Sequence, residues 1–279
     1  MNNVRFGLIG FGLWGRHHAR AIAKTAGAEL VAVAARSDEG RAAAKKAHPD
    51  CHVLADWRDL LRRDDLDVID VVLPSHLHFE VGEAALQAGR HLLLEKPMAI
   101  RSAECRRLTE LAREQGLLLG VGFELRLSEL WGKMKRLIDA GDVGEPLYAV
   151  IELWRRPYRP GSEGWRFDID RVGSWILEEP IHFFDLARWY FGSAGEPQAV
   201  YACANSKQPG HPELHDNFSA VLKFPGGGHA VITQTLAAYE HHQAAKLTGT
   251  QGTLWGSWSG AMDRDPHPKS SLRHFDGQE

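Results

Sequence analysis

The stretch VRFGLIGFGLWG, residues 4–15, places an apolar strand directly before three glycines and a helix-forming segment. In the pattern Gly10-x-Gly12-x-x-Gly15, the first glycine permits a tight turn and the second lets the backbone approach a pyrophosphate. The third allows the helix to pack closely on the strand, and the phosphates would meet the positive helix N-terminus. A lone match can be a simple turn, but its place in the first strand–helix unit favours a dinucleotide site. We expect the cofactor to contact Gly10, Phe11, Gly12, Leu13, Trp14 and Gly15.

Short apolar strands and amphipathic helices alternate as far as about residue 122. Strands separated by helices of this length form βαβ units, whose parallel sheet is covered by helices on both faces. The predicted strands span residues 4–9, 29–35, 53–54, 67–73, 91–94 and 117–122, and the predicted helices span residues 15–25, 38–47, 57–63, 79–88 and 103–115. We therefore predict an α/β fold with an N-terminal Rossmann dinucleotide-binding domain over residues 1–122.

The pattern changes after about Phe123. A long helical segment, residues 128–140, is followed by a glycine–proline turn and then by extended, alternating segments; PGGG, residues 225–228, is a hairpin signal between two of them. Strand-like segments cover residues 147–154, 198–205, 218–224, 229–238 and 243–248, and one clear helix covers residues 177–191. Residues 123–279 are thus predicted to form an α+β domain with an open, mostly antiparallel sheet. The tail from Met262 onward is polar and contains proline, which is typical of a mobile end or of a sheet that is cut short.

The composition is that of an ordinary globular protein, with 44% hydrophobic and 25% charged residues among 279. Lys plus Arg number 33 against 36 for Asp plus Glu, so neither nucleic acid nor an anionic membrane is expected as the main partner. The three cysteines are far apart, and no apolar run approaches the roughly 20 residues of a membrane helix. We expect a cytoplasmic protein. The sequence has neither a His-Glu-x-x-His nor a Cys-x-x-Cys pattern, so we expect no metal.

The end of the second predicted strand bears on which dinucleotide binds. An acid there would bind the ribose 2′-hydroxyl of NAD, but the chain reads Ala-Ala-Arg36-Ser37 with no acid before Asp38. Arg36 can pair with a 2′-phosphate and Ser37 can donate a hydrogen bond to it. The alternative is that Arg36 is a solvated residue that stacks on adenine. We favour NADP and keep NAD as the alternative.

Two further segments, VVLPSHLH at residues 71–78 and AGRHLLLEKP at residues 88–97, identify the family that the chain resembles. Together with the glycine turn they resemble the Gfo/Idh/MocA oxidoreductases, which include glucose–fructose oxidoreductase and inositol dehydrogenases. The resemblance extends from Phe6 to about Gly252. It implies a Rossmann domain followed by an open, largely antiparallel sheet, which binds substrate and makes the contacts of a homodimer or homotetramer.

The Glu-Lys-Pro motif carries the most specific part of this resemblance. It implies that Lys96 contacts both the nicotinamide ribose and the substrate, and that the Lys96–Pro97 peptide can be cis. A lysine is usually a surface residue, but this one follows an apolar strand, where an open parallel sheet binds its ligands. By the same resemblance, the residues lining the cofactor cleft are Leu73, Pro74, Ser75, His78, Glu95 and Lys96, with Ser75 where relatives often have asparagine.

The segment VGSWILEEPIHFFD, residues 172–185, is apolar yet carries two glutamates, a histidine and an aspartate. The family has an aspartate and, four residues later, a histidine on a helix under the nicotinamide. His182 matches that histidine and Glu178 replaces the aspartate. If a helix begins near Leu177, residues three and four apart share a face, so that Glu178, His182 and Asp185 line one side of it. The alternative is that Glu178 and His182 form a purely structural pair.

Hydride transfer from an alcohol needs a base for the hydroxyl proton, and histidine titrates near neutrality. Either His182 or Lys96 could be this base, with the other orienting the substrate hydroxyl; we favour His182 as the proton acceptor, with Lys96 essential. Glu178 is expected either to hold the imidazole or to bind a neighbouring hydroxyl. The longer side chain of Glu178 could shift a catalytic contact by about 1 Å, which suggests a different substrate outline or lost activity. The predicted substrate-binding residues are Glu124, Arg126, Trp165 and Asp185.

The predicted function is NAD(P)-dependent oxidation or reduction of a secondary alcohol or carbonyl in a small polyhydroxylated substrate, such as a sugar, an inositol or a sugar derivative. One alternative is a cofactor-binding regulatory or scaffold protein that kept the fold and lost turnover. Another is an enzyme that uses a tightly bound cofactor for transient oxidation during elimination or glycoside cleavage. The presence of Lys96 and His182 argues against the first alternative.

Overall fold

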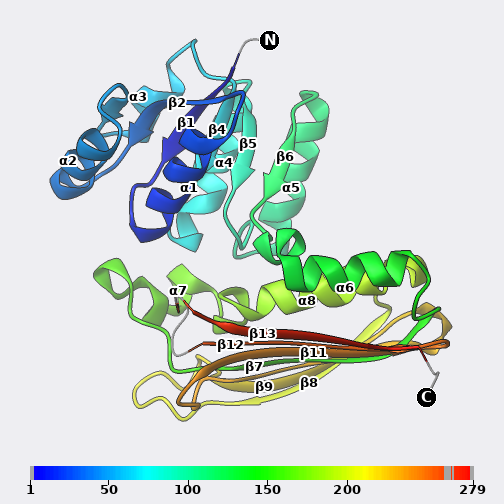
Figure 1. Cartoon of the computed structure of the whole chain (residues 1–279). Coiled ribbons are helices and arrows are strands. Elements are labelled where there is room, and N and C mark those ends of the chain that lie inside the picture. The colour runs from blue at the N-terminus through cyan, green and yellow to red at the C-terminus, as the bar shows by residue number, and fades with distance from the viewer. Residues whose placement is uncertain (1–2, 261–264, 266, 277–279) are drawn as a thin grey trace. The chain divides into compact units, whose positions relative to one another are not determined.

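Two compact units make up the part of the chain that the computed structural model describes, residues 3–260, 265 and 267–276 (Figure 1). Unit 1 holds the described residues up to Gly122 together with Asp170–Gly173. Unit 2 holds Phe123–Ile169 and the described residues from Ser174 onward.

Unit 1 is built on a six-stranded sheet in which all neighbouring strands are parallel, in the order β3-β2-β1-β4-β5-β6. Its strands are β1 (Val4–Ile9), β2 (Ala28–Ala34), β3 (His52–Leu54), β4 (Val68–Val71), β5 (His91–Leu94) and β6 (Leu119–Val121). Its helices are α1 (Leu13–Lys24), α2 (Asp38–Ala47), α3 (Trp57–Leu61), α4 (His78–Gln87) and α5 (Ser102–Glu114). The chain order reverses between β1 and β4, which is where open parallel sheets bind ligands.

The core of unit 1 consists of aliphatic side chains from both the strands and the helices. Ile69, Val71 and Leu94 on the strands are completely buried, as are Leu86 on α4 and Leu108 on α5. Each such side chain contributes about 1.5–3 kcal/mol through its removal from water. This core holds the carboxyl ends of β1, β4 and β5 in fixed positions, and the predicted cofactor residues follow these ends.

Unit 2 contains a seven-stranded sheet in the order β13-β12-β11-β7-β10-β9-β8, in which every described neighbouring pair except β7–β10 is antiparallel. Its strands are β7 (Pro146–Trp154), β8 (Ala199–Asn205), β9 (Asn217–Lys223), β10 (His229–Thr235), β11 (His241–Gly249), β12 (Thr253–Gly260) and β13 (Lys269–Phe275). Two helices, α6 (Glu129–Asp139) and α8 (Pro180–Tyr190), lie along one face of this sheet (Figure 1). A shorter helix, α7 (Ile169–Val172), precedes α8. The predicted fold class is confirmed.

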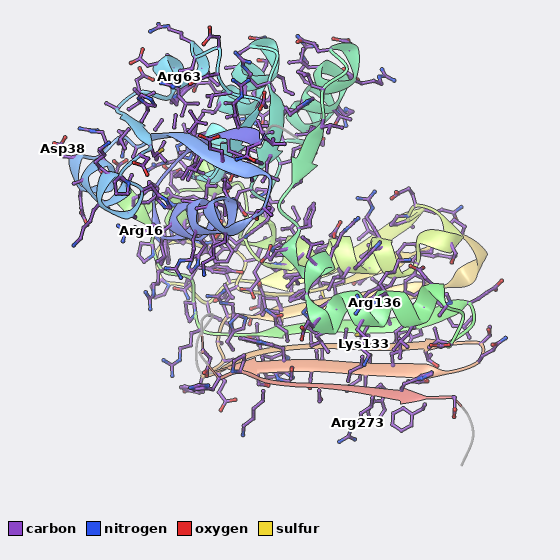
Figure 2. All side chains as sticks on the ribbon, turned by 45° about the horizontal axis from the view of Figure 1, so that its top comes forward. Arg16, Asp38, Arg63, Lys133, Arg136 and Arg273 are labelled. Atoms are coloured by element: carbon purple, nitrogen blue, oxygen red, sulfur yellow. The ribbon has the colours of Figure 1, made fainter. Side chains whose placement is uncertain are left out.

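Helix α6 shows how sequence period selects the buried face. Trp131, Met134 and Ile138 recur at intervals of three and four residues, and all three are buried. Lys133 and Arg136 lie between them in sequence, are exposed, and project from the helix in Figure 2. Ser128 caps the helix by accepting a hydrogen bond from the Trp131 amide at 2.9 Å. Pattern and cap together place α6 on the sheet.

Two parts of unit 2 differ from what the sequence pattern predicts. Lys269–Phe275, within the tail expected to be either mobile or cut short, forms β13, paired with a strand β12 that was not predicted; Met262 itself lies outside the described residues. β12 contains two Ser and two Gly, and β13 contains two Ser, so the apolar alternation of both strands is weak. The helix expected to begin near Leu177 begins at Pro180 instead, after a separate 3-10 turn at Trp175–Leu177. Proline lacks an amide hydrogen and suits the first helical position, so it marks the start of α8.

Candidate cofactor and substrate sites

The glycine turn after β1 has the close contacts that its sequence predicts. Gly10 has φ +103°, and a Cβ built there would lie 2.1 Å from the Val72 carbonyl oxygen. A Cβ on Gly15 would lie 2.0 Å from the Gly10 carbonyl oxygen, whereas nothing described lies within 4 Å of a Cβ on Gly12. Gly10 and Gly15 are therefore required by packing, and the open space at Gly12 fits the approach of a pyrophosphate.

The N-terminus of α1 fits an anion on independent grounds. Among the described residues, no side chain caps this helix start, and its first turn holds no acid. The amides of a first helical turn have no partner within the helix and carry a partial positive charge. Leu13 and Trp14, which begin the helix, are 60% and 38% exposed. The residues present thus fit the phosphates of a dinucleotide.

Arg36 and Ser37 lie just beyond the carboxyl end of β2, and both are exposed. The Ser37 hydroxyl caps α2 by accepting a hydrogen bond from the Gly40 amide at 3.1 Å, and it can still donate its own hydrogen. The nearest acid, Asp38, is ion-paired with Arg41 and projects from the start of α2 in Figure 2. These positions are compatible with the predicted contact to a 2′-phosphate.

The turn after β4 is tied to the Glu-Lys-Pro motif by His78. This imidazole is 1% exposed, and its two nitrogens lie 2.6 Å from the Pro97 carbonyl oxygen and 2.8 Å from the Leu73 carbonyl oxygen. Burial lowers the pKa of His78, against the opposing effect of these two carbonyls. Ser75, in the 3-10 turn Ser75–Leu77, is also buried, at 3% exposure. Both ring nitrogens of His78 therefore contact backbone carbonyl oxygens.

Glu95 and Lys96 follow β5 directly. Glu95 is 7% exposed, and its Oε1 accepts a hydrogen bond from Trp14 Nε1 at 2.9 Å. Its Oε2 accepts from the backbone amide of Lys96 at 3.2 Å. Lys96 is half-buried, and the Lys96–Pro97 peptide is cis. Glu95 thus links the glycine turn to the predicted catalytic lysine within unit 1.

In unit 2, each ionisable residue of the 178–185 segment has a different partner. These partners explain how charged side chains are accommodated in an otherwise apolar stretch. Glu178 accepts a hydrogen bond from Arg166 Nε at 2.5 Å, and Glu179 is ion-paired with Arg155. His182 Nε2 lies 3.3 Å from Glu124 Oε2. Asp185 is bound by Arg126. These partners come from parts of the chain well before the segment.

The predicted helical face of Glu178, His182 and Asp185 was wrong for Glu178. This residue precedes Glu179, the N-cap of α8, so it lies outside the helix. Its side chain is 8% exposed and pairs with Arg166. The i,i+4 relation with His182 therefore does not apply, because the break at Pro180 interrupts the helical period.

His182 and Asp185 do lie on α8, three residues apart, and both are buried, at 3% and 6% exposure. The Phe123 ring packs edge-on against the His182 imidazole at 5.8 Å between centroids. Glu124, which pairs with His182, is half-exposed, with 49% of its side chain accessible. The half-exposed carboxylate of Glu124 thus contacts both solvent and the buried imidazole of His182.

Trp165 and Arg166 form a second part of this site. Trp165 is 7% exposed, and the Arg166 guanidinium carbon lies 4.6 Å from the centroid of its ring. Gly161 faces this tryptophan, since a Cβ there would lie 2.5 Å from Trp165 Nε1. The stack orients Arg166 toward Glu178 and supplies a cation–π contact.

One buried polar network was missed. His241, on β11, is 5% exposed, and its Nε2 lies 2.8 Å from Glu179 Oε1. Gln243 Nε2 donates to the same oxygen at 2.9 Å. Burial alone would raise the pKa of Glu179, but the His241 hydrogen bond and the Arg155 charge outweigh it and hold this pKa far below its usual range. The alternation of His241, Gln243 and Ala245 along β11 was the available signal.

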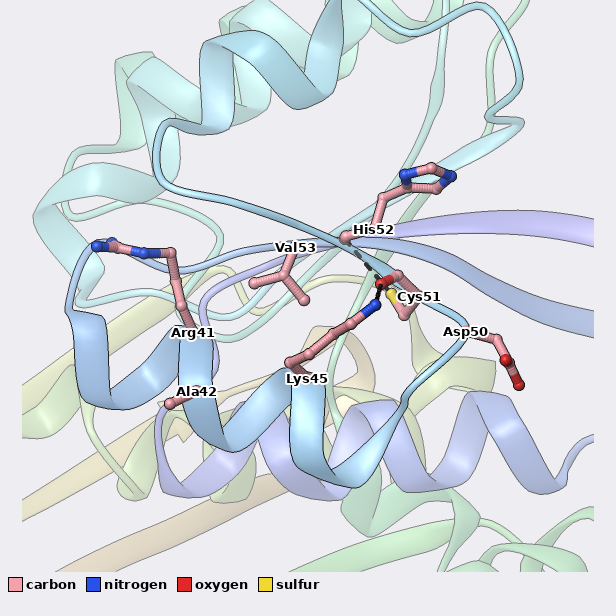
Figure 3. Close-up of a pocket in the computed structure, with 7 residues that line it drawn as sticks. All are labelled: Arg41, Ala42, Lys45, Asp50, Cys51, His52 and Val53. Carbon is pink, nitrogen blue, oxygen red and sulfur yellow. Dashed lines mark hydrogen bonds between the residues drawn. The ribbon is translucent and has the colours of Figure 1, made fainter.

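A pocket of about 480 Å³ opens between α2 and β3 (Figure 3), and its lining residue Arg41 donates a hydrogen bond to the backbone carbonyl of Arg36 at 2.5 Å. Its lining residues are Arg41, Ala42, Lys45, Asp50, Cys51, His52 and Val53. The Lys45 amine donates to the backbone carbonyls of Pro49 and Cys51 at 2.6 and 3.4 Å, and burial raises the pKa of the Cys51 thiol to about 11. The backbone engages the Lys45 amine and the Cys51 thiol is kept protonated, so we assign the pocket no role.

Within the described residues, no group of three or more His, Cys, Asp or Glu side chains is arranged to hold a metal ion. No helix there is long and apolar enough to cross a membrane.

The strand order, the glycine turn at the switch point and the α+β unit together define the class of nicotinamide-dinucleotide-dependent oxidoreductases with a Rossmann domain. Residues 4–123 match the family described as "Oxidoreductase family, NAD-binding Rossmann fold", and residues 131–255 match "GFO/IDH/MocA C-terminal domain". The chain belongs to the Gfo/Idh/MocA oxidoreductase family, so the resemblance stated from its motifs is confirmed.

The relatives and solved structures that the chain resembles include sugar and inositol dehydrogenases. It is 31% identical over 255 residues to the uncharacterized oxidoreductase YrbE of Bacillus subtilis, spanning 88% of this chain and 72% of that protein. It is 30% identical to inositol 2-dehydrogenase of Rhizobium meliloti, spanning 90% and 74%. The WlbA dehydrogenase of Bordetella pertussis, solved with NADH and UDP-GlcNAcA, superposes with a TM-score of 0.83 at 26% identity, over 92% and 77% of the two chains. Levoglucosan dehydrogenase, solved with NADH and levoglucosan, gives 0.82 at 25% identity, over 98% and 80%.

Proposed function

We propose that this oxidoreductase transfers a hydride between NADP and a secondary alcohol or carbonyl of a sugar, an inositol or a sugar derivative. The observation that carries the proposal is the coexistence, in one family member, of the glycine turn, Glu-Lys-Pro and a buried His182. Relatives named for inositol and 1,5-anhydro-D-fructose support the substrate class. Residues 1–122 would bind the cofactor, and residues 123–279 would bind the substrate.

The preference for NADP rests on Arg36 and Ser37. Both are exposed at the end of β2, and Asp38, the acid closest in sequence, is ion-paired with Arg41. A guanidinium pairs with a phosphate through charge-assisted hydrogen bonds, which the hydroxyl of NAD would not provide. Two structural relatives were solved with NADH, so this preference would distinguish the chain from them.

Catalysis requires that a proton leave the substrate hydroxyl while the nicotinamide, when bound, accepts the hydride. We assign the proton to His182 Nε2, the nitrogen that faces Glu124. Lys96 would hydrogen-bond the substrate oxygen and stabilise its developing negative charge. Glu178, held by Arg166, would bind a neighbouring hydroxyl; it has no direct role on the His182 ring, because it precedes α8.

The residues of the ion pairs around α8 would line the substrate-binding site. Glu124 and Arg126 enter it from the 3-10 turn Glu124–Leu127, and Asp185 enters from α8. Trp165 offers an aromatic face of the kind that suits the C–H surface of a polyol. Carboxylates and guanidinium groups together offer both acceptors and donors to a polyhydroxylated ligand.

A second copy of the chain is the partner that we propose for the other face of the unit 2 sheet. Alternating residues of β7 point to opposite faces: Ala149, Ile151 and Leu153 are buried, whereas Tyr148 and Trp154 are 39% and 51% exposed. Exposed aromatic residues on two other strands of the sheet extend this surface, namely Tyr201 on β8 and Trp255 on β12. Apolar side chains spread over such a face are typical of a protein interface, so a homodimer or homotetramer is expected.

The deciding experiment is a panel of sugars, inositols and sugar derivatives assayed by nicotinamide absorbance, with NADP and NAD in parallel. Turnover with at least one polyol, faster with NADP, is the expected result. Cofactor binding without turnover of any substrate would favour the regulatory or scaffold alternative. Product formed without net change in nicotinamide absorbance would favour transient oxidation by a bound cofactor.

A further inference from the structure

A cluster of charged side chains joins three elements of unit 1. His18, on α1, has Nδ1 2.8 Å from Asp70 Oδ2 on β4 and Nε2 3.0 Å from Glu95 Oε1, just after β5. The same Glu95 oxygen accepts the Trp14 indole hydrogen at 2.9 Å. A single imidazole thus bridges two carboxylates, one of which contacts both the glycine turn and the Lys96 amide.

With both carboxyl groups ionised, the two bonds need a doubly protonated ring, because carboxylates accept hydrogen bonds and a neutral imidazole has one hydrogen to donate. Burial alone would lower the pKa of His18, but the hydrogen bonds to Asp70 and Glu95 outweigh it and raise this pKa to about 10. Burial raises the pKa of Asp70, whereas for Glu95 the bonds from His18 and Trp14 and the charge of Lys96 outweigh burial and lower its pKa.

Burying this cluster of charged side chains costs free energy, which a purely structural role does not explain. Asp70 is 0% exposed and lies between apolar neighbours on β4, and its Oδ1 has no hydrogen-bond partner among the described residues. Removing charges from water costs more free energy than burying an apolar side chain, so an apolar residue here would serve the core at least as well. A role in the function of the neighbouring site accounts for this cost.

We propose that His18 is a positioning residue of the cofactor site, which holds the Glu95 carboxylate so that the Trp14 end of the glycine turn and the Glu95–Lys96 peptide keep one arrangement. The proposal rests on the proposed function only in taking these residues to bind the cofactor. Without the imidazolium, Asp70 and Glu95 lose the cation between them, and Glu95 turns away from Trp14 or is protonated. Either change weakens the contacts that Glu95 makes with the Trp14 indole and with the Lys96 amide.

The test separates positioning from stability with three variants, His18→Gln, Asp70→Asn and the double variant. Dissociation constants for NADPH and NADH are measured by fluorescence, and melting midpoints by calorimetry. His18→Gln should lower the melting midpoint and weaken binding of the preferred cofactor by about tenfold or more, the equivalent of one lost charge-assisted hydrogen bond. Asp70→Asn keeps the bond from His18 to Glu95, so binding should stay within about threefold of wild type. The double variant removes the unpaired charge and should regain most of the melting midpoint but not the affinity.

The control is His52→Gln, because His52 is exposed on β3 and none of its described contacts reaches Asp70 or Glu95. It should bind cofactor as the wild type does. Wild-type affinity in the double variant would overturn the proposal, since the cluster would then serve stability alone. Equal loss in Asp70→Asn and His18→Gln would also overturn it, because charge balance rather than the bridge to Glu95 would matter. If the wild type binds cofactor but oxidises no polyol, the proposed function is refuted. The dissociation constants of the variants then still decide whether His18 positions the cofactor site.

Discussion

Arg126 binds Asp185 through two hydrogen bonds, from Nε at 2.7 Å and from Nη2 at 2.6 Å, one to each carboxylate oxygen. The carboxylate is 7% exposed and the arginine 42%. The pair joins the 3-10 turn that carries Glu124 to the helix that carries His182. A planar guanidinium fixes both distance and angle, so this pair holds the two elements of the predicted substrate site in register.

Replacing this arginine should therefore affect both stability and substrate binding. Arg126→Ala leaves a buried carboxylate without its partner and should lower the free energy of unfolding by about 3 kcal/mol. Arg126→Lys keeps the charge but loses the two-point geometry, and should raise the substrate KM more than it lowers kcat. Urea denaturation and steady-state kinetics measure the two effects. Arg188→Ala is the control: it removes an exposed pair with Glu196 and should cost about 1 kcal/mol or less. Similar losses in Arg126→Ala and Arg188→Ala would contradict the assignment.

Lys96→Ala and His182→Ala should each lower kcat by about 100-fold or more, the usual contribution of a positioned acid–base group. Stopped-flow and steady-state measurements of nicotinamide absorbance check both variants. Lys133→Ala and His52→Ala change exposed residues of the same types and should retain wild-type rates. Full activity in either Lys96→Ala or His182→Ala would refute the corresponding assignment.

Arg36→Ala should weaken the binding of NADP by about tenfold or more, which is the effect of losing a charge-assisted contact. The binding of NAD should change little. The ratio of kcat/KM for the two cofactors is the measurement. Arg62→Ala, which removes an exposed arginine at the end of α3, should leave that ratio unchanged. A wild type that prefers NAD, or an equal loss with both cofactors, would show that Arg36 does not recognise the phosphate.

Glu179→Gln should lower the free energy of unfolding by about 3–5 kcal/mol, because it leaves Arg155 without its carboxylate in a buried network. The pKa of Glu179 is held below its usual value in the folded protein, so its contribution is fully present above the unfolded value, near 4.5, and declines as pH falls below it. The difference between wild type and variant should therefore shrink on acidification. Urea titrations from neutral to acid pH test this. Glu196→Gln, in an exposed pair, should show at most a small difference; a Glu179→Gln effect that grows on acidification would contradict the assignment.

Much of unit 1 could be predicted because its signals are local. Predicted and observed bounds of the strand at His91–Leu94 and the helix at Asp38–Ala47 agree, since strand and helix periods are set by neighbouring residues. The turn at Gly10 requires a positive φ, which only the backbone of glycine adopts readily. Unit 2 was less predictable at β12 and β13, where strand formation depends on pairing with β11 more than on an apolar pattern.

By itself, then, the sequence determined the family, the parallel sheet with its glycine turn, and the residue types available for chemistry. Tertiary structure alone decided which charges meet: Arg166 with Glu178, Glu124 with His182, and His18 with both Asp70 and Glu95. The reason is physical. Turns and helices depend on residues a few positions apart, whereas an ion pair depends on where the packing of distant elements brings two side-chain tips, and a break such as Pro180 redirects one of them.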